Sequence, residues 1–192
     1  EMCIRDSLSG AFIEGEIVGA AFGFPARDDD GTYYIHSHMA AVLPSHHDQG
    51  IGLGLKLHQK DWAIKEGYKK IKWTFDPLVA RNAWFNIARL KTRAVKYYVD
   101  FYGPMADAIN AGDASDRILV EWDLLNEKVS TPFANQILVE IPRDIVEIRQ
   151  SDIESARNWR KKVREALKPK LDAGWSIVDF TKDYKYVLSE GK

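Results

Sequence analysis

The chain contains little cysteine, no long apolar run and no excess of charge of either sign. Cys3 is the only cysteine among 192 residues, which excludes a disulfide framework within the chain and a thiolate metal site. The longest apolar stretches, such as residues 17–24, are far shorter than a membrane-spanning helix. Lysine and arginine number 27 against 28 acidic residues, without a basic block, so we expect no nucleic-acid partner. A globular cytoplasmic protein without membrane contacts fits this composition best.

The first seven residues follow neither a helical nor a strand period. Glu1–Ser7 also lacks the apolar core of a signal peptide. The segment resembles translated sequencing-adapter read-through of the kind found at the ends of assembled metagenomic fragments. We therefore expect residues 1–7 to be a non-native leader.

Regular apolar patterning begins at Leu8 and predicts a mixed α/β domain up to residue 125. Short β-branched and aromatic runs alternate with two helical segments, and Gly, Pro and Asp residues separate them. Residues 25–31 are predicted to form a loop. The other predicted elements are strands at residues 11–13, 17–24, 32–43, 70–75, 97–102 and 117–124, and helices at residues 51–66 and 81–90.

A second pattern follows in residues 126–192, which we predict to be a C-terminal extension. Ser151 and Glu154 form a capping box for a helix that reaches about residue 173, and Pro169 is expected to kink or shorten it. Its predicted apolar face consists of Ile153, Ala156, Val163, Ala166, Leu167 and Leu171. The remaining predicted elements are strands at residues 136–141, 175–181 and 184–188.

The segment from Met39 to Lys56 carries the strongest chemical signal. An apolar strand runs into Pro44, then into a short polar loop, and then into glycines that begin a helix. Glycine allows the backbone to approach a ligand closely, and the unpaired amides of a first helical turn attract an anion. The segment therefore predicts a phosphate or pyrophosphate site, without identifying the ligand.

A dinucleotide site is one alternative interpretation of these glycines. Gly50, Gly52 and Gly54 lie between a strand and a helix, and Asp76 ends the next strand, as in NAD(P)-dependent oxidoreductases. In those enzymes the glycines follow the strand almost directly and form Gly-x-Gly-x-x-Gly. Here residues 44–49 intervene and that spacing is not met, so this alternative is less favoured.

The same segment resembles the pyrophosphate loop of the GNAT superfamily of acyl-CoA N-acyltransferases, which has the pattern Arg/Gln-x-x-Gly-x-Gly/Ala. Counting from Pro44 aligns residues 47–52 with this pattern and puts His47 at the Arg/Gln position. Counting from the glutamine of the loop aligns residues 49–54 and matches literally. We prefer the first register because geometry fixes the distance of the loop from the strand. It departs from the family at His47 and at Asp48, whose charge would lie near the pyrophosphate.

Later segments extend the resemblance over residues 11–124. The strand and turn at residues 73–78 resemble the family's next strand, and the helix that follows contains Asn82, at a position that usually helps to hold the CoA arm. Further segments that resemble a GNAT subfamily are Ser37-His38-Met39, residues 100–103, and residues 115–122.

The resemblance implies an α+β fold with a mixed, mainly antiparallel sheet and a splayed parallel strand pair at residues 32–43 and 70–75. It implies acetyl-CoA or another acyl-CoA as co-substrate, and acyl transfer to the amine of a small molecule or an amino-acid-like acceptor. A GNAT domain also begins with one strand and two helices that we do not find before residue 11. The expected CoA-binding residues are Ala40, Ala41, Val42, His47, Asp48, Gln49, Gly50, Ile51, Gly52, Leu53 and Asn82.

Acyl transfer needs a base for the amine and an acid for the leaving thiolate. His36 and His38 alternate with Ser37, so both should point to one face of their strand. His38 is nearer to the point where the two parallel strands are expected to separate, and it is our candidate base. The alternative is that His38 is a hydrogen-bonded histidine of the core. Many GNAT enzymes use as the acid a tyrosine at the position that Arg89 occupies here. Among the tyrosines of the next strand Tyr102 is our candidate acid, unless solvent protonates the thiolate.

Two further alternatives stay open. A zinc site would have to use the five histidines, but no acidic or cysteine partner lies at ligand spacing, so we expect no metal. A non-catalytic acyl-CoA-binding module would explain why the expected Arg/Gln and tyrosine are missing. Release of free thiol from acetyl-CoA distinguishes such a module from an enzyme.

Overall fold

The computed structural model describes residues 6–103, 113–125 and 135–190. Most of the predicted leader and the predicted boundary after residue 125 lie outside the described residues. The chain divides into two compact units. The first unit comprises residues 1–73 and 122–127, and the second comprises residues 74–121 and 128–192.

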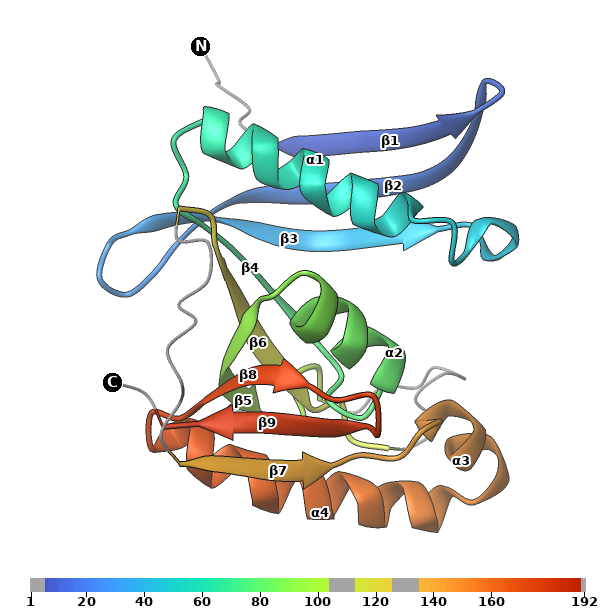
Figure 1. Ribbon diagram of the computed structural model, residues 1–192, viewed down its shortest axis with the longest axis vertical. Coiled ribbons are helices and arrows are strands. Elements are labelled where there is room, and N and C mark those ends of the chain that lie inside the picture. Colours follow the sequence, from blue (N-terminus) through green and yellow to red (C-terminus); the bar gives the residue numbers. More distant parts are fainter. Residues whose placement is uncertain (1–5, 104–112, 126–134, 191–192) are drawn as a thin grey trace. The chain divides into compact units, whose positions relative to one another are not determined.

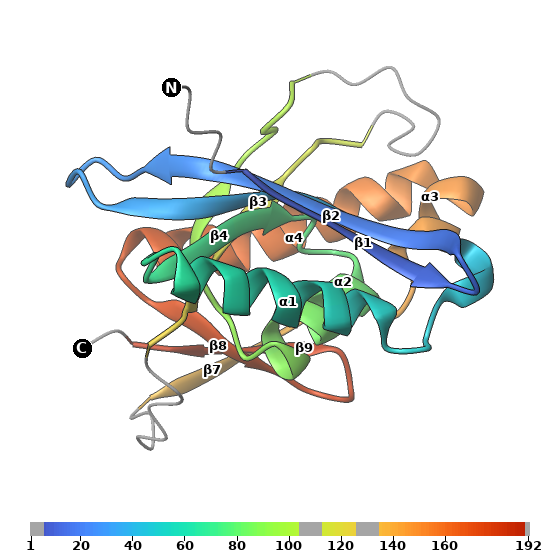
Figure 2. The same cartoon turned by 90° about the horizontal axis from the view of Figure 1, so that it is seen from above.

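The first unit is a sheet with one helix on it (Figure 1). Strands β1 (Ser7–Ile13), β2 (Glu16–Arg27) and β3 (Tyr33–Val42) form an antiparallel meander, and the start of β4 (Lys70–Phe75) pairs with β3 in parallel. Helix α1 (Ile51–Lys65) lies across β1, β2 and β3, as Figure 2 shows from above. The predicted hairpin, the mixed sheet and its parallel pair are confirmed.

Strand β2 is longer than the sequence predicts, because it continues through Pro25 to Arg27. Among the described residues, β1 pairs with β2 only as far as Gly23, and the last residues of β2 have β3 as their one paired neighbour. Proline lacks the N–H that a central strand needs and is tolerated at the edge of a sheet. The predicted loop therefore begins after Arg27 rather than at Pro25.

Two glycines of β2 allow α1 to pack closely on the sheet. A Cβ atom on Gly23 would lie 2.9 Å from Nε2 of Gln59, and one on Gly19 would lie 3.2 Å from Cδ1 of Leu55. The buried residues of α1 are Leu55, Lys56, Gln59 and Ala63. The sheet-facing stripe of α1 therefore includes two polar side chains, Lys56 and Gln59.

The second unit contains a group of strands in the order β6-β5-β8-β9-β7, in which all neighbours are antiparallel. Helix α4 packs against β5, β7 and β8. The elements of this unit, with β6 extending into the first unit, are α2 (Ala80–Ala83), the π-helix η2 (Trp84–Arg89), β5 (Arg93–Tyr98), β6 (Arg117–Asp123), β7 (Gln136–Glu140), α3 (Ile145–Ser151), α4 (Ile153–Asp172), β8 (Ser176–Phe180) and β9 (Lys185–Ser189). The predicted C-terminal strand, helix and hairpin are confirmed.

Strand β5 lies earlier in the chain than the predicted range of residues 97–102. It ends at Tyr98 because Asp100 adopts a left-handed backbone conformation with φ 46°. The amide of Asp100 donates to the carboxylate of Asp116 at 2.9 Å, which stabilises the turn. Tyr102 therefore lies in a turn and not in a strand.

Helix α4 matches the predicted C-terminal helix, but the short helix α3 precedes it, and the cap differs from the prediction. Ser151 ends α3, and Asp152 caps α4 by accepting a hydrogen bond from the amide of Ser155 at 3.0 Å. The separate cap of α3 is Asp144. α4 runs past Pro169 to Asp172, because a proline this close to the C-terminus removes only one helical hydrogen bond.

A cluster of four buried charges holds the second unit together. Asp76 and Asp113 each lie within 3 Å of guanidinium nitrogens from both Arg149 and Arg160, and all four side chains are less than 10% exposed. Arg160 lies on the face of α4 that was predicted to be purely apolar. Because Asp76 follows β4 and the arginines lie on α3 and α4, the cluster joins segments far apart in the sequence.

Candidate functional site

The loop after β3 is held to the end of that strand by a histidine. A 3₁₀ turn, η1 (Pro44–His46), is followed by His47, whose Nε2 donates to the carbonyl of Val42 at 2.9 Å. Because a carbonyl only accepts, the Nε2 atom of His47 carries the proton. The residue at the family's Arg/Gln position therefore anchors the loop.

Two residues in the left-handed conformation turn the chain into α1. Asp48 has φ 61° and Gly50, the N-cap of α1, has φ 81°. A Cβ atom on Gly50 would meet nothing within 4 Å, so glycine is favoured there by its backbone angle rather than by lack of space. Gly50 therefore shapes the loop through its left-handed backbone conformation, which turns the chain into α1.

The first turn of α1 leaves backbone amides without helical acceptors. The first hydrogen bond of the helix runs from the amide of Gly54 to the carbonyl of Gly50, at 2.9 Å. The amides of Ile51, Gly52 and Leu53 precede it and point out of the helix N-terminus, where the helix dipole favours an anion. This geometry favours the register over residues 47–52. The alternative register ends at Gly54, whose amide donates to Gly50 within the helix and so does not face a ligand.

Strands β3 and β4 pair over a short length and then separate. The pairs are Ile35 with Ile71 and His36 with Lys72. From Ser37 to Val42, β3 is paired with β2 and has no recorded pairing with the described residues of β4. This stretch of β3, which we call the open edge, contains three of the predicted CoA-binding residues and leads directly into the loop.

The two candidate histidines lie on one face of β3, as predicted. His38 is the extra residue of a β-bulge, since Ser37 pairs with Gly23 and Met39 pairs with Phe22. The imidazole rings of His36 and His38 are 6.0 Å apart, and the ring of Phe24 lies 5.1 Å and 5.7 Å from them. Bulges are common beside active sites because they redirect a side chain.

The surroundings of these histidines differ. His36 is partly buried, and burial together with the positive charge of His38 and Lys56 lowers the pKa of His36 below its ordinary value. His38 is exposed and lies beyond the last pair of β3 with β4. It is therefore the more accessible of the two and the one nearer to the open edge.

A buried lysine of the same unit was not found from the sequence. Lys56 is 4% exposed, and its Nζ donates to the hydroxyl of Ser37 at 2.6 Å. Burial lowers the pKa of Lys56 to about 7. A sequence signal existed, because residues 52, 55, 56, 59 and 63 recur at helical spacing.

The candidate acids belong to the second unit. Tyr102 is exposed, and its ring lies 5.0 Å from the guanidinium of Arg117. The hydroxyl of Tyr97 is buried and donates to Asp116 at 2.6 Å, and burial with this hydrogen bond raises the pKa of Tyr97, so it is a poor proton donor. Asn82 and Arg89 are both exposed, on α2 and at the end of η2.

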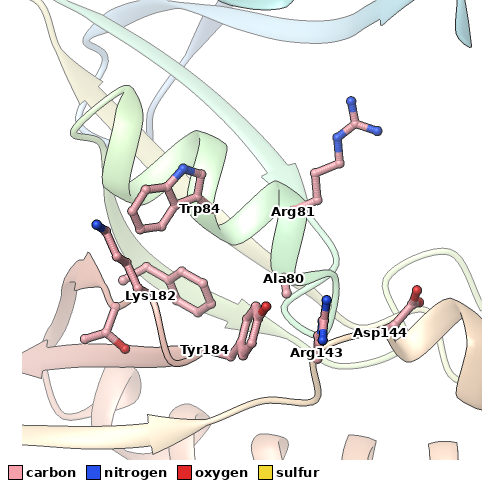
Figure 3. A pocket seen from close by; sticks show the side chains of 9 residues that line it. Ala80, Arg81, Trp84, Arg143, Asp144, Lys182 and Tyr184 are labelled. Carbon is pink, nitrogen blue, oxygen red and sulfur yellow. The ribbon is translucent and has the colours of Figure 1, made fainter. Parts of the chain in front are cut away.

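The second unit also contains a pocket of about 460 Å³ (Figure 3). Trp84 and Tyr184 line it together with Lys182, and Figure 3 shows Arg81 pointing away from them. The carboxylate of Asp144 caps α3 and is thus already hydrogen bonded. None of the predicted site residues lines this pocket. Its full lining is Ala80, Arg81, Trp84, Arg143, Asp144, Phe180, Thr181, Lys182 and Tyr184.

Among the described residues, no helix is both long enough and apolar enough to cross a membrane. In the same ranges, no group of three or more His, Cys, Asp or Glu side chains could hold a metal ion.

The antiparallel meander, the parallel pair that separates and the helix that follows the glycine loop define the chain as a protein with a GNAT acyltransferase fold. Residues 4–85 match the family model described as the Acetyltransferase (GNAT) family, and the chain is similar to that family over this range. The predicted resemblance is confirmed over these residues, and the matched family is one of acetyltransferases, the predicted class of enzyme. A search of curated proteins by sequence gave no match.

Solved structures with the same fold are distant in sequence. A GNAT family acetyltransferase from Elizabethkingia anophelis with acetyl-CoA bound is 20% identical, with a TM-score of 0.53 over 62% of this chain and 76% of that chain. Chaetomium thermophilum Naa20 in complex with a bisubstrate analogue is 17% identical, with a TM-score of 0.52 over 60% and 65%. The ribosomal-protein-S18-alanine N-acetyltransferase from Escherichia coli is 19% identical, with a TM-score of 0.50 over 67% and 76%. These similarities establish the fold.

Proposed function

We propose that the chain binds acyl-CoA along the open edge of β3 and at the N-terminus of α1, and transfers the acyl group, with acetyl as the default, to the amine of a small acceptor. The observation that carries this proposal is the continuity of the two features. The open edge from Ser37 to Val42 runs into a loop that ends at the free amides of Ile51, Gly52 and Leu53. A pantetheine arm can pair with a strand edge while its pyrophosphate accepts from helical amides.

In this proposal His38 removes the proton of the acceptor ammonium, and the neutral amine attacks the thioester carbon. A backbone amide of the open edge donates to the thioester oxygen, where negative charge develops. The C–S bond then breaks, and the CoA thiolate takes a proton from solvent. His38 has the role of base because it is exposed beside the open edge, and the role of Tyr102 as the acid stays a prediction from the sequence.

The dinucleotide alternative is less favoured by the topology. β3, α1 and β4 do form a parallel βαβ unit, but β3 otherwise belongs to an antiparallel meander, and residues 43–50 separate it from α1, whereas the glycines of a dinucleotide site follow their strand almost directly. The binding-module alternative is separated from an enzyme by release of thiol from acetyl-CoA. The acceptor panel should include small amines and peptides with a free N-terminus, since one protein of this fold is named a ribosomal-protein-S18-alanine N-acetyltransferase.

A glycine in the first turn of α1 provides the test of CoA binding. Gly52→Val adds a branched side chain beside the free amides and should raise the CoA dissociation constant at least about tenfold, which corresponds to about 1.4 kcal/mol. The constant is measured by isothermal titration calorimetry with CoA. Unchanged affinity in a folded Gly52→Val protein would contradict the assignment.

Gly54→Ala is the matched control. A Cβ atom on Gly54 would meet nothing within 4 Å, and its amide is bonded within the helix. Alanine should leave CoA affinity unchanged and stabilise the protein by about 0.5–1 kcal/mol through its helix propensity. A loss of CoA affinity at Gly54 as large as that at Gly52 would favour the register over residues 49–54 instead.

A further inference from the structure

Two lysines of the first unit are almost completely buried, and they differ in their partners. Lys72 is 5% exposed, and its Nζ lies 2.7 Å and 2.8 Å from the two carboxylate oxygens of Asp28. Lys56 is 4% exposed, and its contacts are the Ser37 hydroxyl and the face of the Trp73 ring. No acidic side chain among the described residues forms an ion pair with Lys56, so its burial is not compensated by an opposite charge.

Lys56 lies where β3 and β4 separate. Ile35 pairs with Ile71, so in a continued parallel ladder the next pair on the same face would be Ser37 with Trp73. Instead, Nζ of Lys56 lies 2.6 Å from the hydroxyl of Ser37 and 3.7 Å from the centroid of the Trp73 ring. The amine of Lys56 therefore lies between Ser37 and Trp73, at the point where β3 and β4 separate and the open edge begins. We call this point the vertex.

The contacts of this amine leave its lone pair available. Burial lowers the pKa of Lys56 to about 7, so about half of the side chain is neutral at neutral pH. Its bond to Ser37 uses an N–H, and the electron-rich face of an indole ring attracts N–H groups rather than a lone pair. A desolvated neutral lysine is a nucleophile that reacts with carbonyl compounds.

We propose that Lys56 is itself an acyl acceptor, and that the protein becomes acylated on Lys56 by its own acyl-CoA. This inference rests on the proposed binding of acyl-CoA along the open edge. The lone pair of Nζ attacks the thioester carbon, the C–S bond breaks, and the proton released from Nζ passes to the CoA thiolate. The products are an Nε-acyl amide and free CoA. The amide keeps one N–H for Ser37, and its acyl group fills the vertex, so the modification should inhibit further turnover.

The test uses the whole chain and acetyl-CoA near neutral pH, followed by intact mass and peptide mapping. We expect one acetyl group on Lys56 to appear at least about tenfold faster than acetylation of Lys60 or Lys72, because an ordinary lysine is only about 0.1% neutral at this pH. Excess CoA should suppress acetylation of Lys56 and leave surface lysines unaffected, because it occupies the same site.

Variants and a binding measurement make the result decisive. Lys56→Met should abolish the fast acetylation, whereas Lys60→Met, one turn further along α1, should retain it. If calorimetry shows that CoA binds while Lys56 of the wild-type protein stays unmodified, this inference is overturned and the proposed function survives. If CoA does not bind at all, both are overturned. Peptide mapping of the wild-type chain decides the question even if Lys56→Met fails to fold.

Discussion

Replacing Asp76 by asparagine is expected to lower the free energy of unfolding by about 3–5 kcal/mol, the cost of removing one partner from a buried ion cluster. Asp76 accepts from Arg160 at 2.7 Å and from Arg149 at 2.6 Å, and both guanidinium groups are at most 4% exposed. The neutral amide leaves two buried arginines to share the remaining carboxylate of Asp113. Urea unfolding at neutral pH measures the loss.

The control for this substitution is Asp179→Asn. Asp179 pairs with Lys91 at 3.6 Å, and both side chains are about half exposed. Exposed ion pairs contribute about 0–1 kcal/mol, so this variant should unfold close to the wild-type midpoint. A loss below 1 kcal/mol for Asp76→Asn would show that the cluster does not hold α3 and α4 in place.

The same carboxylate predicts a pH dependence of stability. Burial opposes ionisation of Asp76, but hydrogen bonds and charge from Arg160 and Arg149 prevail and lower its pKa from 3.8 to about 2. A pKa lowered by folding stabilises the protein fully above the unfolded value, and this contribution is lost as the pH falls from about 4 to about 2. Over that range the stability of wild type should fall more steeply than that of Asp76→Asn.

The second large effect is expected at the candidate base. His38→Gln should lower turnover by roughly 100-fold or more, because a positioned general base contributes about 10²–10⁴-fold. CoA affinity should change little, since the imidazole is proposed to act on the acceptor amine. Thiol release from acetyl-CoA with an accepted amine measures turnover, and calorimetry measures CoA binding.

His36→Gln is the matched control, because His36 lies on the same face and packs against the same ring of Phe24. It is more buried than His38, so its loss should reduce thermal stability more than turnover. If His38→Gln reduces activity and thermal stability in parallel, His38 is a packing residue and another group is the base.

Much of the secondary structure follows from local sequence. The predicted range of β4, residues 70–75, is the observed one, and α1 begins at the predicted Ile51. Glycine, proline and β-branched residues act within a few positions of themselves, so their effects are readable in a short window. The same reasoning located the glycine loop, which requires a left-handed residue directly before the helix.

Elsewhere tertiary contacts overrode the local pattern. Pro25 remains in β2 because β1 has already ended there, and Asp152 rather than Ser151 caps α4 because the chain turns between two helices. Tyr102 left its predicted strand because Asp100 and Asp116 form a turn. In each case a distant or neighbouring segment supplied a partner that the local window does not contain.

The sequence by itself determined the family resemblance, the strand–loop–helix order of the candidate anion site and the shared face of His36 and His38. Only the tertiary structure decided which buried charges find partners. Asp76 and Arg160 lie 84 positions apart and form an ion pair, whereas Lys56 is buried against Ser37 and Trp73 without a carboxylate. The reason is physical: periodicity tells which side chains face inward, but the cost of burying a charge depends on what the rest of the chain places within 3 Å of it.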